Sequence, residues 1–201
     1  STHGQLYNTA IEINNLLQTV ETTMYQSVWT IEESLNDPDS LYRIIAAVAE
    51  NNDLIESSGI AFEPYYYKTK GKYFMPYVSV INKKTEYSLL GSQSYDYPCM
   101  DWYLIPKLLK KSYWSEPYYD AGGGNTIVGT YSMPLYDVNG EIYAVFIANI
   151  SLSQFTDMVG KLKPYEFSHT FLLSRNGGFL THVDRTKIMN ETIFSEAFDT
   201  Q

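Results

Sequence analysis

The residues best suited to bind a small molecule gather in one aromatic and acidic stretch, from Tyr95 to Asp120. Aromatic rings give a ligand contact area at little entropic cost, and carboxylates beside them orient a donor or a cation. A short segment, 104–111, has the apolar spacing of a helix and separates two such clusters. We expect the flanks of this helix to line a pocket, although the rings could instead fill the protein's own core. The cluster residues are Asp101, Trp102, Tyr103, Trp114, Tyr118 and Asp120.

Composition narrows the classes of partner. The chain has 201 residues, 44% of them hydrophobic and 18% charged, which is typical of a folded globular protein. Its formal charge of −9 argues against nucleic acid as a partner, because phosphate binding needs a basic face. The one cysteine, Cys99, excludes an internal disulfide and a cysteine-based zinc site, and it is expected to pack as a small hydrophobe. No metal and no cofactor are expected.

An enzyme is the second class considered. His3, His169 and His182 lie far from the aromatic stretch, and the sequence has no metal-binding His spacing, nucleophile elbow or phosphate loop. Asp101 and Glu116 could imitate the acid pair of a glycosidase, so a hydrolase acting on sugars stays an alternative. Such pairs arise easily by chance, and no catalytic residue is expected.

The elements that must position the site begin with a long helix over 3–35, which has apolar residues three or four apart throughout. At 1.5 Å per residue it would be ~45 Å long, more than one small domain needs. Asn139-Gly140, between two apolar runs, predicts a hairpin with a type I′ turn whose second strand is central in its sheet. The remaining expected elements are a helix at 39–51, strands at 54–62, 73–81 and 85–90, a helix at 151–161, a second hairpin over 169–183 and a helical stretch at 185–198.

Strands followed by helices in this order predict an α+β fold. We expect a long N-terminal helix, a PAS-like antiparallel five-stranded sheet flanked by helices, and the start of a second PAS-like unit. The expected divisions are a stalk helix at 1–36, a ligand-binding module at 37–158, and a connecting helix with an incomplete second module at 159–201.

This combination resembles the extracytoplasmic double Cache (PAS-like, or PDC) sensor domains of bacterial and archaeal histidine kinases and chemoreceptors. The resemblance rests on the long first helix, Asp101-Trp102-Tyr103, the 114–120 cluster, and the hairpin from Tyr131 to Gly140. It implies a domain that faces the periplasm or cell exterior and signals through the first helix and a proximal module. It also implies a membrane anchor through spans outside this chain, since no apolar run here reaches the ~20 residues of a span. A sensor histidine kinase is the expected receptor type, and a homodimer is left open.

The resemblance also implies a ligand set. Amino-acid-binding members hold their ligand with residues that match Tyr95, Trp102, Tyr103, Tyr118 and Asp120, and the set expected here adds Tyr131. Two positions depart from that pattern. Met100 stands where an Arg would clamp the ligand carboxylate, and Asn149 stands where an Asp would hold the ammonium.

Met offers no hydrogen-bond donor, so a buried ligand carboxylate would lose its main partner. We therefore expect a neutral or cationic small molecule, with an amine favoured because a cation over Trp or Tyr gains roughly 0.5–2 kcal/mol. The alternative is a domain that binds no small molecule and contacts a partner protein, for which the Tyr-rich segment 65–67 would be suited.

Overall fold

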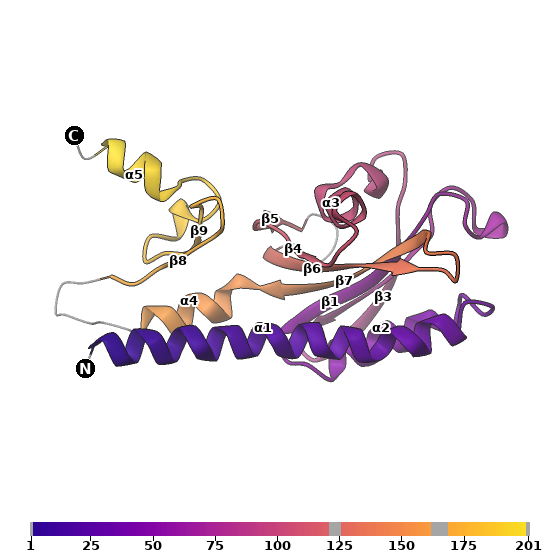
Figure 1. The fold of residues 1–201 in the computed structure, drawn as a ribbon, viewed down its shortest axis with the longest axis horizontal. Helices are drawn as coiled ribbons and strands as arrows, with labels where there is room; N and C mark the ends of the chain where they lie inside the picture. Colours follow the sequence, from indigo (N-terminus) through magenta and orange to yellow (C-terminus); the bar gives the residue numbers. More distant parts are fainter. Residues whose placement is uncertain (1, 121–125, 162–168, 200–201) are drawn as a thin grey trace.

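The computed structural model describes residues 2–120, 126–161 and 169–199. Its longest element, α1 (Thr2–Glu33), runs beneath the sheet and beside α2 (Leu41–Glu50), as Figure 1 shows. Val20, Met24 and Ile31 are fully buried on one side of α1, which is the periodic face that predicted this helix. Within the described part of the chain, no helix combines the length and apolar character needed to cross a membrane.

The five expected long strands form one antiparallel sheet, and two short strands extend it. The order is β3-β2-β1-β7-β6-β4, with β5 also paired to β6. β7 lies between β1 and β6 and is buried along most of its length, so the prediction of a central strand is confirmed. The bounds are β1 Ile55–Phe62, β2 Met75–Ile81, β3 Lys84–Leu90, β4 Tyr113–Trp114, β5 Tyr118–Tyr119, β6 Ile127–Tyr136 and β7 Ile142–Ser151.

The sheet separates two cores. Val78 belongs to the core that α1 and α2 cover, whereas Met75 and Tyr77 belong to a smaller core on the opposite face. This alternation along β2 follows the expected strand period of two residues. α3 (Asp101–Leu109) covers the smaller core, and a 3₁₀ turn, η2 (Tyr97–Cys99), leads into it. The candidate pocket residues therefore lie mainly on the face opposite the long helix.

The short helix expected over 104–111 runs over 101–109, and its leucines do not form its buried face. Leu104, Leu108 and Leu109 are exposed, and the helix instead buries Trp102, Tyr103 and Pro106. The two large rings bury more apolar area than the leucines would, so they decide which side faces the sheet. Lys110 in the left-handed conformation then ends the helix.

The turn between β6 and β7 differs from the prediction. A type I′ turn needs positive φ at both central residues, yet only Gly140 has it, at +81°. The Asp137 carboxylate accepts the backbone N–H groups of Asn139 and Glu141, at 2.8 and 2.9 Å. This local cap favours a longer loop that ends on the glycine, and the hairpin itself is as predicted.

A smaller unit follows helix α4 (Leu152–Gly160), whose first turn is capped by the Ser151 hydroxyl. We call the described residues 169–199 the C-terminal unit. It contains a two-stranded sheet with the predicted hairpin, while the predicted helix at 185–198 is broken into a 3₁₀ turn and a short helix. The expected boundary at 158/159 falls inside α4. The elements are β8 Leu172–Leu173, β9 Phe179–Thr181, η3 Arg185–Lys187 and α5 Ile193–Asp199.

Candidate functional site

A cavity of about 640 Å³ lies beside α3, walled by the start of that helix and by the segment that carries β4 and β5. Six of the residues expected at the site line it. These six are Tyr95, Met100, Asp101, Trp102, Tyr118 and Asp120. The other lining residues are Cys99, Ile105, Tyr113, Ser115, Glu116, Pro117, Tyr119 and Asn176.

The start of α3 supplies one wall. Met100 has an extended backbone and precedes the helix, so Asp101 is its first residue and Trp102 follows in the buried first turn. The Trp102 indole packs on Tyr97 and Tyr103, with ring centroids 6.4 and 6.0 Å apart. These contacts fix the indole, which leaves a rigid apolar surface for a ligand.

Asp120 is the most buried acid of the cavity, with 4% of its surface exposed. Its Oδ2 accepts a hydrogen bond from the Tyr77 hydroxyl at 3.0 Å and one from the Asn149 amide at 3.4 Å. Hydrogen bonds of this kind fix the direction of a carboxylate oxygen.

A network behind Asp120 supports this arrangement. The Thr130 hydroxyl donates to Asn149 Oδ1 at 2.7 Å, and the Tyr118 hydroxyl lies 2.7 Å from Thr130 Oγ1. Asn149 also donates to Ser57 at 2.9 Å. With Tyr77 of β2, the side chains come from β1, β2, β5, β6 and β7, so five strands hold one carboxylate in place.

Two tyrosines close to Asp120 have raised pKa values. Burial, with a smaller contribution from the Asp120 charge, raises the pKa of Tyr95 to about 12. Burial and the same carboxylate also raise the pKa of Tyr77 well above its usual range. The phenols therefore act at neutral pH as hydrogen-bonding groups, and the charge that the described lining offers a ligand comes from its carboxylates.

Four expected site residues do not line this cavity. Tyr103 is buried in the smaller core together with Trp102 and donates to Glu63 at 2.6 Å. Trp114 and Tyr131 pack together toward α1, with the Trp114 indole donating to Glu21 at 2.7 Å. Asn149 lies behind Asp120, as described above. Side-chain direction along two-residue strands such as β4 is not readable from the sequence, which explains the error for Trp114.

Several residues around the cavity were not predicted to belong to the site. Tyr77, Ser57 and Thr130 lie on strands distant in sequence, and no local pattern marks them as partners of an acid. Asn176 joins the lining from the C-terminal unit. Cys99 was expected to be packed, yet it is exposed, and its thiol donates to Asp96 at 3.4 Å. The turn η2 directs it outward while Tyr97, two residues earlier, fills the core.

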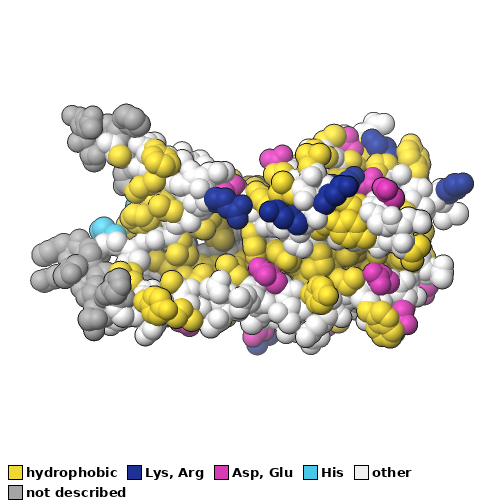
Figure 2. Space-filling model, in the orientation of Figure 1, with side chains coloured by type: hydrophobic (Ala, Val, Ile, Leu, Met, Phe, Trp, Pro, Cys, Tyr) yellow, Lys and Arg dark blue, Asp and Glu magenta, His cyan; other side chains and the backbone are white. Residues whose placement is uncertain are grey.

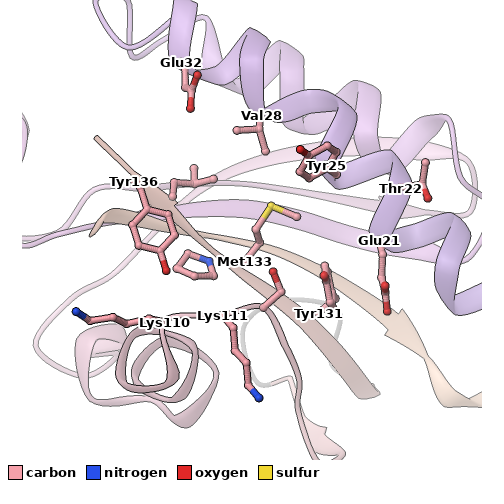
Figure 3. A pocket seen from close by; sticks show the side chains of 13 residues that line it. Glu21, Thr22, Tyr25, Val28, Glu32, Lys110, Lys111, Tyr131, Met133 and Tyr136 are labelled. Carbon is pink, nitrogen blue, oxygen red and sulfur yellow. The ribbon is translucent and has the colours of Figure 1, made fainter. Parts of the chain in front are cut away.

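A second cavity, of about 510 Å³, lies on the opposite face of the sheet, between α1 and β6 (Figure 3). Tyr25 and Val28 of α1 line one side, and Lys110 and Lys111 lie across from them. Figure 2 shows hydrophobic side chains along a hollow above α1, bordered by Lys or Arg side chains. Acids and lysines both line this cavity, so the charge of the lining favours neither a cationic nor an anionic ligand.

Comparison with known proteins shows the family and the fold of the chain. Residues 41–157 match the family model described as methyl-accepting chemotaxis protein-like, first PDC sensor domain, which confirms the resemblance drawn from the sequence. No curated protein matches the chain.

Solved structures share the fold. The structure of Methyl-accepting Chemotaxis protein X has a TM-score of 0.80 at 20% identity, over 99% of this chain and 80% of that one. The extracellular domain of the histidine kinase soHK1S-Z6 has a TM-score of 0.75 at 24% identity, over 100% and 81%. The ligand-binding domain of the Pseudomonas aeruginosa PAO1 amino acid chemoreceptor PctB, in complex with L-Gln, has a TM-score of 0.67 at 17% identity, over 94% and 70%.

Proposed function

Because the chain belongs to the methyl-accepting chemotaxis protein-like PDC sensor domains, we propose that it senses a small cationic molecule, an amine, in the cavity beside Trp102 and Asp120. The ligand ammonium would sit against Asp120, and its carbon skeleton would lie on the rings of Trp102 and Tyr118. The chain would act by binding and not by catalysis.

The observation that carries this proposal is the charge of the lining. Asp101, Glu116 and Asp120 line the cavity, and no Lys, Arg or His does so among the described residues. Carboxylates gathered in a partly closed space repel one another, and a bound cation relieves that repulsion. Aromatic faces add a further attraction for a positive charge.

An amino acid is the neighbouring candidate, because the PctB domain was solved with L-Gln. Its ammonium could use Asp120, but its carboxylate would then need a donor inside the same cavity. Met100 lines the cavity and supplies none. A further negative charge beside three carboxylates is unfavourable, so the lining favours a ligand without a carboxylate.

A domain without a small-molecule ligand would fill the space beside Trp102, Tyr118 and Asp120 with its own side chains. A cavity of about 640 Å³ at this position instead supports a small molecule. Asp101 and Glu116 both line it, so a glycosidase remains testable by assaying sugar hydrolysis, which we expect to be undetectable.

The same family membership supports a placement for the domain. We propose that it faces the periplasm or cell exterior in a membrane-anchored receptor, a sensor histidine kinase or chemoreceptor. Its structural neighbours include an extracellular domain of a histidine kinase and a periplasmic sensory domain of a chemoreceptor, which supports this placement. A homodimer through α1 is also proposed. Its support is the set of exposed apolar residues on α1: Tyr7, Ile11, Tyr25 and Trp29.

A thermal-shift screen tests the ligand class. The purified chain is heated with amines, with zwitterionic amino acids and with simple carboxylates at equal concentration and ionic strength. We expect amines to raise the melting temperature most, since a ligand that binds only the folded state stabilises it. Stronger stabilisation by carboxylates than by amines would refute the argument from Met100 and the acidic lining.

A further inference from the structure

One lining residue of the ligand cavity comes from outside the module that forms the rest of it. Asn176 lies in the turn between β8 and β9, in the C-terminal unit, yet it lines the same cavity as Trp102 and Asp120. In sequence it is more than fifty residues beyond Asp120. The cavity is therefore shared between the main sheet module and the C-terminal unit.

The turn that carries Asn176 is held from both sides. Gly177 donates to the Ser174 carbonyl at 3.0 Å, and Ser174 donates to the Gly178 carbonyl at 2.8 Å. Gly177 has φ of +80°, and a Cβ there would come within 2.7 Å of the Phe194 ring. Its carbonyl also accepts the Ile193 N–H at 2.9 Å. The position of Asn176 is thus tied to the start of α5.

The wall of the ligand cavity also touches the junction of the two units. Ser115 and Pro117 line the ligand cavity on one side and an apolar space of about 130 Å³ on the other. Leu172 and Leu180 of the C-terminal unit line that second space, together with Ile13 and Leu17 of α1. If a ligand displaced this wall, the displacement would therefore reach residues of both the C-terminal unit and the long helix.

From these contacts we propose that Asn176 is a ligand-contacting residue, so that the C-terminal unit completes the binding site and senses its occupancy directly. This inference rests on the proposed function. The amide is neutral and can both donate and accept. It suits the polar end of a ligand whose ammonium sits on Asp120, and it selects for molecules long enough to reach both residues.

The single thiol offers a test that needs no identified ligand, because Cys99 lines the same cavity. Its reaction rates are measured with aminoethyl methanethiosulfonate, a cation, and sulfonatoethyl methanethiosulfonate, an anion. Each rate is divided by that of 2-mercaptoethanol with the same reagent. The ratio of the two results reports the electrostatic potential in the cavity.

Asn176→Lys should lower the cation-to-anion ratio by about fourfold, the order of magnitude for a unit charge that acts across the cavity through water. Asn176→Asp should raise it. Val183→Lys is the matched control, because Val183 is an exposed residue of the same unit that does not line the cavity. Equal ratios for Asn176→Lys and Val183→Lys would overturn the inference.

The role of Asn176 and the proposed function can be refuted independently of each other. Asp120→Asn should also lower the ratio, and an unchanged ratio in that variant counts against the acidic cavity and the proposed function. For contact itself, tyramine binding is measured by calorimetry in Asn176→Ala, with a loss of about five- to twentyfold in affinity expected for one hydrogen bond. Unchanged tyramine affinity in Asn176→Ala, with weakened affinity in Asp120→Asn, would refute the role of Asn176 and leave the proposed function standing.

Discussion

Replacing Asp120 with Asn removes one negative charge from the cavity and changes almost nothing else. The Asn side chain has the same shape, and its carbonyl oxygen can still accept the Tyr77 hydroxyl that lies 3.0 Å from Oδ2 in the wild type. Asp120 is nearly fully buried, so a ligand cation facing it is only weakly screened by solvent. The variant therefore isolates the charge from the packing.

The magnitude follows from the kind of bond that is lost. A hydrogen bond to a charged group contributes about 1.5–3 kcal/mol, roughly a 10- to 150-fold change in Kd. The lower half of this range is expected, because Asp101 and Glu116 remain in the lining and continue to attract the cation. We expect tyramine to bind about 10- to 40-fold more weakly to Asp120→Asn.

Isothermal titration calorimetry with tyramine measures this loss, and circular dichroism checks that the variant remains folded. Asp39→Asn is the matched control, since that acid is 75% exposed in its ion pair with Lys70 and does not line the cavity. It should leave Kd unchanged within twofold. A folded Asp120→Asn variant with wild-type affinity for tyramine would refute the assignment of Asp120 as the counter-ion.

Four further predictions concern the fold around the site. Thr130→Val should destabilise the chain by about 2–3 kcal/mol in urea unfolding, because it deprives buried Asn149 of its donor; a loss under 0.5 kcal/mol would contradict the network. Tyr103→Phe should lower the free energy of unfolding by about 1–2 kcal/mol, because the hydrogen bond to Glu63 is lost. Tyramine affinity should stay unchanged, and a changed affinity would place Tyr103 in the site. Leu108→Ser should stay within about 0.5 kcal/mol of wild type, since the side chain is 79% exposed; a larger loss would show that this face of α3 is covered. Backbone hydrogen bonds, first of all that from Glu141, lower the pKa of Asp137 in the folded state. The stabilisation that Asp137 gives the folded chain is therefore present above its ordinary pKa of 3.8 and is lost as the pH falls through the lower folded value. In acid titrations of stability, Asp137→Asn should lose less stability than the wild type, and identical curves would contradict this.

The parts of the fold that depend on local periodicity could be read from the sequence. The repeat of apolar residues three or four apart in α1 and the two-residue alternation in β2 both appear in the structure as buried faces. The unbroken apolar run of β7 likewise indicated a strand with neighbours on both sides. In each case one segment carries enough residues for the pattern to identify its buried side.

The rest depends on contacts that no local pattern encodes. In α3, nine residues present apolar groups on more than one side, and the areas of Trp102 and Tyr103 decide which side is buried. Trp114 belongs to a two-residue strand, where the direction of a side chain is set by its pairing with Tyr131. Ser57, Thr130 and Asn176 reach the site only through tertiary packing. Residue types thus indicated which segment lines a cavity, but they did not indicate which strands complete its wall.

The central claim is that the cavity selects for positive charge. Calorimetric titrations with tyramine and with 3-(4-hydroxyphenyl)propionate test it most directly, because the two molecules share the ring and the chain and differ in the charge of the end group. At neutral pH and low salt, tyramine should bind at least about tenfold more tightly, which corresponds to about 1.4 kcal/mol. Equal binding of the two, or tighter binding of the carboxylate, would contradict the account.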